Sequence, residues 1–155
     1  MKKIILLLTI FISVANSTLV FAAPKESTLL RIERRNPSEG EPEITNVGAF
    51  GAGGGKYAHL DVSYLKSKKD GNGWGLDVGG GYLLPTTAIL YLGAGFLLGD
   101  NVEQHKLIDA FYPEVGVIIN VTSEFGISAS KKRYFHLNGR TEDVIMLGIV
   151  MSILQ

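Results

Sequence analysis

The stretch "GLDVGGGYLLPTTAILYLGAGFLL", from Gly75 to Leu98, decides the fold class of this chain. It has one charged residue, Asp77, and an apolar run of this length is long enough to span a bilayer as a helix. However, it also contains the triplet 79–81 of three glycines, and Pro85 lies near its middle. Glycine costs roughly 1 kcal/mol and proline about 3 kcal/mol in a helix interior, so a helix here would be weak.

With a period of two, the same stretch shows one large apolar face and one small or polar face. The large face has Trp74, Leu76, Val78, Gly80 and Tyr82, then Leu90, Leu92, Ala94, Phe96 and Leu98. The opposite face has Gly75, Asp77, Gly79, Gly81 and Leu83, then Ile89, Tyr91, Gly93, Gly95 and Leu97. This alternation predicts a hairpin of two strands with its turn at Pro85 and Thr86.

Six further segments alternate in the same way and predict six more strands. They cover residues 28–35, 43–55, 57–65, 107–120, 123–130 and 142–154. Short connections are expected at 54–56, 85–87 and 120–123, and long polar ones at 36–42, 66–73, 99–106 and 131–141. Short turns at one end and longer loops at the other are typical of transmembrane barrels, in which closure leaves no strand edge unpaired. The sequence therefore predicts an all-β protein, an eight-stranded antiparallel up-and-down transmembrane β-barrel.

Aromatic residues near the strand ends support a barrel with two membrane interfaces. Those expected near the long loops are Tyr64, Trp74, Phe96, Phe111 and Tyr134. Those expected near the short turns are Tyr57, Tyr82 and Phe125. The alternative is a soluble barrel in which the aromatic residues only anchor strand ends.

The N-terminal residues have the three parts of a secretory signal peptide. Lys2 and Lys3 form the basic start, residues 4–14 form the apolar run, and small residues precede a cleavage position after Ala22. An uncleaved membrane anchor is the alternative, and it is disfavoured because polar residues at 16–18 interrupt the run.

The predicted organisation is a signal peptide over 1–22, a flexible lead over 23–27 and an outer-membrane β-barrel over 28–155. The whole chain has 15 basic and 15 acidic residues, and removing Lys2 and Lys3 leaves 13 − 15 = −2. This balance argues against a nucleic-acid partner. The chain has no cysteine, which excludes disulfides and thiolate chemistry. An exported bacterial protein of the outer membrane is expected.

The chain resembles the small eight-stranded outer-membrane barrels, the OmpA membrane-domain and OmpX-like group. The resemblance rests on "DVGGGY", "LYLGAGF", "YPEVGV" and the signal peptide. It implies a monomeric barrel assembled by the outer-membrane insertion machinery. Members of that group typically end their last strand on an aromatic residue, whereas this chain ends "SILQ".

Charged residues on the small faces are expected inside the barrel. They are Arg31, Glu33, Arg35, Asp61, Asp77, Glu114 and Glu124. An eight-stranded barrel has an interior just wide enough for side chains to fill, and buried charges must be paired. We expect a network of ion pairs that plugs the lumen; the alternative is a gated polar path.

The inner face of 57–65 also offers a weak case for catalysis. His59, Asp61 and Ser63 share this face, but same-face neighbours on one strand lie about 6.6–7 Å apart, which is too far for direct hydrogen bonds without long side chains or water. His105 and His136 have no carboxylate spacing that suggests a metal. We therefore expect no enzyme activity, no metal and no cofactor.

Two predicted loops are basic. They contain Lys66, Lys68 and Lys69 in one, and Lys131, Lys132 and Arg133 in the other. Such loops would be attracted to the phosphates of lipopolysaccharide, or they are simply solvated. The expected role is therefore structural or surface-interacting: membrane integrity, contact with outer-membrane lipids and lipopolysaccharide, or adhesion. The alternatives are a narrow pore for small solutes and a lipid-modifying outer-membrane enzyme.

Overall fold

The computed structural model describes residues 27–35, 37, 42–67, 71–84, 86, 88–101, 106–107 and 109–154. These residues form eight long strands and one strand of two residues. The strands are β1 (Ser27–Arg35), β2 (Glu43–Gly53), β3 (Lys56–Ser67), β4 (Gly71–Leu84), β5 (Ile89–Asn101), β6 (Lys106–Leu107), β7 (Ala110–Asn120), β8 (Phe125–His136) and β9 (Thr141–Leu154). The predicted signal peptide and most of the predicted lead lie outside the described residues. Within the described ranges, no helix is long and apolar enough to cross a membrane.

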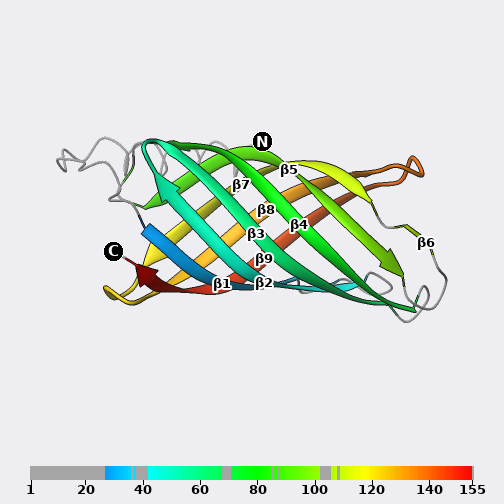
Figure 1. Ribbon diagram of the computed structural model, residues 1–155, viewed down its shortest axis with the longest axis horizontal. Helices are drawn as coiled ribbons and strands as arrows, with labels where there is room; N and C mark the ends of the chain where they lie inside the picture. The colour runs from blue at the N-terminus through cyan, green and yellow to red at the C-terminus, as the bar shows by residue number, and fades with distance from the viewer. Residues whose placement is uncertain are drawn as a thin grey trace, which may run out of the picture.

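The long strands close into a barrel (Figure 1). Each pairs antiparallel with the next long strand along the chain, and β1 pairs with β9 to complete the ring. The short strand β6 pairs only with the end of β5. This arrangement confirms the predicted all-β, eight-stranded, antiparallel up-and-down barrel.

The connections define two ends of the barrel. We call the end with connections 54–55, 85–88 and 121–124 the turn end, and the end with connections 36–42, 68–70, 102–109 and 137–140 the loop end. Two predicted long connections are wrong, because the strands continue into them. The connection expected over 66–73 shortens to 68–70, and the one expected over 131–141 is a turn over 137–140.

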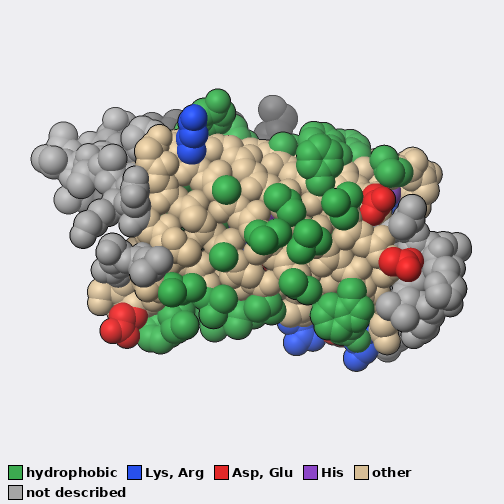
Figure 2. Space-filling model, in the orientation of Figure 1, with side chains coloured by type: hydrophobic (Ala, Val, Ile, Leu, Met, Phe, Trp, Pro, Cys, Tyr) green, Lys and Arg blue, Asp and Glu red, His purple; other side chains and the backbone are tan. Residues whose placement is uncertain are grey.

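The outer wall is largely apolar, and its exposed charges include Arg34, Lys131 and Arg133 in the loop-end half of their strands. Its exposed large side chains come from all eight long strands and include Ile32, Val47, Leu60, Val62, Leu76, Val78, Leu92, Phe96, Val115, Ile127, Ile145, Leu147 and Ile149. Figure 2 shows hydrophobic side chains spread over the face of the barrel that is in view. The predicted outward and inward faces are confirmed for these strands, because alternate residues are exposed and buried.

Most of the predicted aromatic residues lie on the outer wall, but two do not. At the loop end, Tyr64 packs on Trp74 with ring centroids 4.7 Å apart, and Phe96 packs on Phe111 at 5.6 Å. Tyr57 and Tyr134, by contrast, are buried in the lumen. Their predicted position at the membrane interfaces is wrong. Each is an even number of residues away from the inward-facing residues of its strand, so its side chain also points inward.

Candidate functional site

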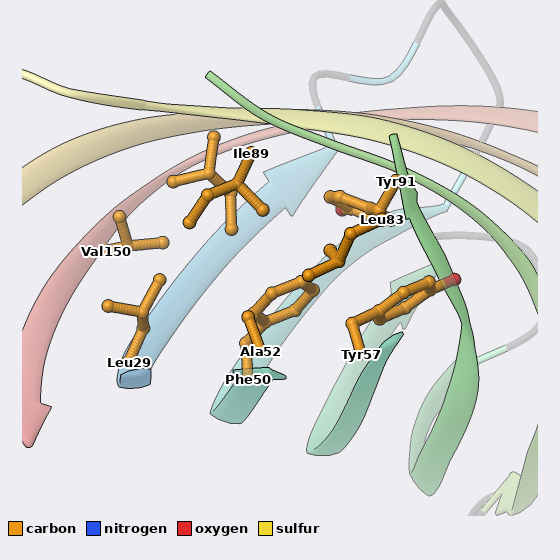
Figure 3. Close-up of a cluster of buried hydrophobic side chains, with 9 residues drawn as sticks. Leu29, Phe50, Ala52, Tyr57, Leu83, Ile89, Tyr91 and Val150 are labelled. Carbon is orange, nitrogen blue, oxygen red and sulfur yellow. The ribbon is translucent and has the colours of Figure 1, made fainter. Parts of the chain in front are cut away.

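The lumen is arranged in three layers. One apolar cluster lies at the turn end and consists of Leu29, Phe50, Ala52, Tyr57, Leu83, Ile89, Tyr91, Ile118 and Val150 (Figure 3). A second lies at the loop end and consists of Ile44, Leu97, Ala110, Tyr112, Tyr134, Val144 and Met146, with Leu65 against it. The buried polar side chains lie between these clusters, so hydrocarbon and aromatic groups cover the polar layer at both ends.

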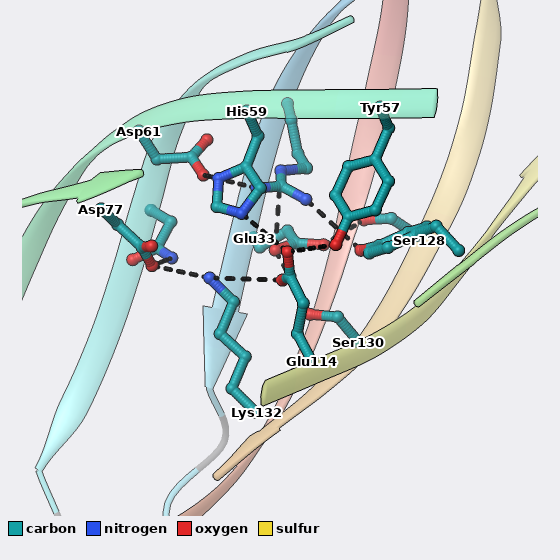
Figure 4. Close-up of polar contacts among 12 residues, drawn as sticks. Glu33, Tyr57, His59, Asp61, Asp77, Glu114, Ser128, Ser130 and Lys132 are labelled. Atoms are coloured by element: carbon teal, nitrogen blue, oxygen red, sulfur yellow. Dashed lines mark hydrogen bonds and ion pairs between the residues drawn. The ribbon is translucent and has the colours of Figure 1, made fainter. Parts of the chain in front are cut away.

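His59 from β3 is central to the polar layer, with a carboxylate at each ring nitrogen (Figure 4). Its Nδ1 is 2.8 Å from Asp61 Oδ2, and its Nε2 is 2.9 Å from Glu114 Oε1. Nε2 makes a hydrogen bond to Glu114, whereas Nδ1 makes none within the described part of the chain, although Asp61 lies close to it. His59 thus links β3 to β7 across the lumen.

Arg31 occupies the side of the polar layer that faces β1. Its guanidinium donates a hydrogen bond to Asp61 and lies 3.7 Å, Nε to Oε2, from Glu33. Glu33 in turn accepts a hydrogen bond of 2.9 Å from the Ser128 hydroxyl. The guanidinium carbon also lies 5.4 Å from the centre of the Phe50 ring, which is within the range of a cation–π contact. The arginine thus joins the polar layer to the turn-end cluster.

Lys132 from β8 occupies the part of the polar layer beside Asp77. Its Nζ is 2.6 Å from Asp77 Oδ2 and 3.9 Å from Glu114 Oε2, and it lies 4.5 Å above the centre of the Tyr112 ring. The Tyr112 hydroxyl also donates to Asp77, as does Asn46 Nδ2 at 3.2 Å. The Tyr134 hydroxyl donates to Asp77 as well, at 3.4 Å. Asp77 therefore has a cation and three neutral donors around it, which offset the cost of burying its charge.

Glycines on the inner face make room for the tyrosines of the lumen. A Cβ on Gly95 would overlap the ring and hydroxyl of Tyr112, and a Cβ on Gly116 would overlap the Tyr91 ring. A Cβ on Gly93 would likewise meet the Tyr57 hydroxyl. These close approaches give a physical reason for Gly93 and Gly95 in the Gly75–Leu98 stretch, because a larger residue at either position would meet a tyrosine side chain of the lumen.

The structure places the predicted lumen charges as follows. Arg31, Glu33, Asp61, Asp77 and Glu114 are buried and belong to the polar layer. Arg35 is also buried but pairs separately with Glu142, nearer the loop end. Glu124 is exposed in the turn between β7 and β8, so its prediction as a lumen residue is wrong. The strand β8 begins at Phe125, so Glu124 precedes the alternation of inward and outward residues.

The basic residues divide differently from the prediction. Lys66 is exposed, Lys68 and Lys69 lie outside the described residues, and Lys131 and Arg133 are exposed on β8. Lys132 was predicted to lie in a lipopolysaccharide-contact loop, and this is wrong because its side chain is fully buried against Asp77. The run "KKR" continues the strand, so its middle residue points inward and its two neighbours point outward. The parity of Ser128 and Ser130 was the signal that could have identified Lys132.

The arrangement around His59 does not form a nucleophile–base pair. Both ring nitrogens face carboxylates, and the buried Ser63 hydroxyl has no hydrogen-bond partner among the described residues. In the same part of the chain, no group of three or more His, Asp or Glu side chains is placed to hold a metal ion. What the site does chemically is neutralise buried charge: four carboxylates face Arg31, Lys132 and His59 within one layer.

Comparisons with known proteins agree with this fold. Neither a protein-family model nor a curated protein matches the chain. A de novo designed protein, TMB2.3, solved by NMR in solution, is similar with a TM-score of 0.55 and 14% sequence identity, over 84% of this chain and 96% of the designed one. The crystal structure of Neisserial surface protein A (NspA) is similar with a TM-score of 0.52 and 13% identity, over 82% of this chain and 91% of that one. At these identities the likeness is one of fold: a small eight-stranded β-barrel.

Proposed function

We propose that this protein is an outer-membrane β-barrel with a structural or surface-interaction role and a lumen plugged by paired charges. Its long strands span 9 to 14 residues, and a transmembrane β-strand needs about 9–11. An apolar outer wall on such strands suits a hydrocarbon environment. The signal peptide, the outer-membrane location and the grouping with OmpA- and OmpX-like barrels belong to this proposal, as do monomeric assembly and the insertion machinery as a partner.

One observation carries the plugged lumen: the polar layer is internally paired and lies between two apolar clusters. Each cationic or basic side chain of the layer contacts a carboxylate of another strand: Arg31 contacts Asp61, His59 contacts Glu114, and Lys132 contacts Asp77. With opposite charges in so narrow a space, pairing lowers the energy more than an open aqueous path would. The proposed role therefore lies in the wall and the loop end, and it includes contact with outer-membrane lipids and lipopolysaccharide.

Planar-bilayer recording of the refolded barrel tests the plugged lumen against the narrow pore. We expect no stable single-channel steps from the wild-type protein. The informative variant is Asp77→Asn, which removes one charge from the Lys132 pair. Steady steps in the wild type that disappear in this variant would establish a pore through the polar layer and exclude the plug.

A lipid-modifying enzyme is the less favoured alternative. We propose no enzymatic role, since the one buried histidine of the polar layer, His59, is bracketed by carboxylates and covered by apolar clusters at both ends. Ester hydrolysis by the purified protein that is lost in a Ser63→Ala variant would contradict this.

A further inference from the structure

The outer wall has a depression over β7, β8 and β9. This groove, of about 270 Å³, is lined by Val117, Ile119, Ile127, Ala129 and Leu147, with Ser128 and Gly148 at its floor. In the sheet, Ala129 pairs with Val117 on one side and with Leu147 on the other. Because its methyl group is shorter than the side chains on both sides, a shallow apolar channel runs between them.

A pair of cations follows the groove along the same strand face. The outward residues of β8 continue from Ile127 and Ala129 to Lys131 and Arg133, towards the loop end. Successive residues on one face of a strand lie about 6.6–7 Å apart, so the basic pair begins one such step beyond the groove. The apolar channel is complementary to an acyl chain, and the exposed cations beyond it are complementary to a phosphorylated head group.

The cations share a single acidic neighbour. Arg133 makes two hydrogen bonds to Asp143 of β9, at 2.6 and 2.7 Å, and Lys131 Nζ lies 4.0 Å from the same carboxylate. The latter distance is beyond a hydrogen bond, so Asp143 does not use the donors of Lys131. Two positive charges against one negative charge leave a local excess, and lysine and arginine are the side chains that bind phosphate.

We propose that this groove and the pair Lys131–Arg133 form one binding site for the phosphorylated, acylated glycolipid of lipopolysaccharide, lipid A. One acyl chain lies over Ala129 and a phosphate lies against Lys131 and Arg133. The inference rests on the proposed function, which turns the loop end towards the lipopolysaccharide leaflet. Since surrounding lipid is as apolar as the protein wall, the groove acts through close packing with the chain, while the phosphate contact supplies the selectivity.

Native mass spectrometry of the refolded full chain in detergent micelles, with purified lipid A added, tests the site. Ala129→Leu fills the groove, and its matched control is Ala94→Leu, at an exposed small residue on the outward face of β5. The double variant Lys131→Gln with Arg133→Gln removes the cations. Its control is Arg34→Gln, at an exposed arginine that makes one hydrogen bond to Glu43 on another part of the wall. Gel mobility without heating confirms that each variant is folded.

We expect the double variant to weaken lipid A retention by about tenfold, as one lost charge-assisted hydrogen bond predicts, with little change in Arg34→Gln. Ala129→Leu should weaken retention severalfold and Ala94→Leu should not. Dephosphorylated lipid A should bind the wild type no better than intact lipid A binds the double variant.

The outcomes separate this site from the broader proposal. A wild type that retains lipid A no better than phosphatidylethanolamine overturns both the lipopolysaccharide contact and the site. Preferential retention that survives in Ala129→Leu and in the double variant overturns the site alone. Equal competition by phosphatidylglycerol overturns lipid A as the occupant, and dimers that Ala129→Leu abolishes would show that the groove joins two copies of the chain.

Discussion

At the level of single residues, Lys131 and Lys132 are neighbours with opposite surroundings. Lys131 is exposed near Asp143, whereas Lys132 is fully buried against Asp77. A buried charge that loses its partner keeps the cost of its own desolvation, while an exposed one is solvated by water. The same substitution at the two positions therefore has very different consequences.

Replacing Lys132 by glutamine is expected to destabilise the barrel by about 3–5 kcal/mol, because Asp77 would remain buried with its cation removed. Urea unfolding of the refolded protein in lipid vesicles measures this. Lys131→Gln is the matched control and should leave the free energy of unfolding nearly unchanged. Equal stability of the two variants would show that the Lys132 pair does not support the fold.

A second residue-scale prediction concerns the glycines under the tyrosines. Gly95→Ala should cost about 1–3 kcal/mol, because the added methyl group displaces the Tyr112 ring from its place beside Asp77. Gly51→Ala is the control, since a Cβ there meets nothing closer than the Ala58 carbonyl oxygen at 3.9 Å. Unfolding curves that coincide for Gly95→Ala and the wild type would mean that the lumen has spare room.

At the level of elements, each strand presents one face to the lumen and one to the outside. The alternation in the sequence predicted these faces on β3, β4, β5, β7 and β9. It does not predict where β8 ends, because the three charges of "KKR" favour a loop. In the structure the strand continues to His136, since Lys132 finds carboxylates inside while its neighbours remain exposed.

The outward face of β5 gives a prediction at this scale. Leu92 is 54% exposed on the wall, between Tyr82 and Val115 of the adjacent strands. Leu92→Arg should destabilise the barrel in lipid vesicles by about 1–3 kcal/mol, because an arginine on the lipid face costs about 2–4 kcal/mol at the midplane and less towards an interface, and Leu92 is near the turn-end start of β5. Leu92→Ala should be tolerated, because a lipid chain replaces the lost contacts. Similar unfolding free energies for the two variants would show that this face does not meet hydrocarbon.

At the level of the whole molecule, closure between β1 and β9 removes the free edges, and the outer wall remains apolar all round. A surface of this kind is not stable in water, whereas it needs no cover in a bilayer. We expect the protein to sediment with outer membranes on cell fractionation and to resist extraction by high salt. Its gel mobility should differ between heated and unheated samples. Recovery in the soluble periplasmic fraction without detergent would contradict the membrane proposal.

The sequence by itself determined the class of fold and the direction of most side chains. Glycines and Pro85 disfavour a helix in the Gly75–Leu98 stretch, and a period of two is a local property that can be counted along the chain. For the same reason the inward positions of Arg31, Asp61 and Glu114 were predictable.

The tertiary structure alone decided which of these side chains meet. His59 contacts Glu114 from 55 positions away, and Lys132 reaches Asp77 over the same separation. Such contacts depend on the stagger between strands and on closure of the ring, which set the height of each residue in the lumen and leave no trace in the local pattern.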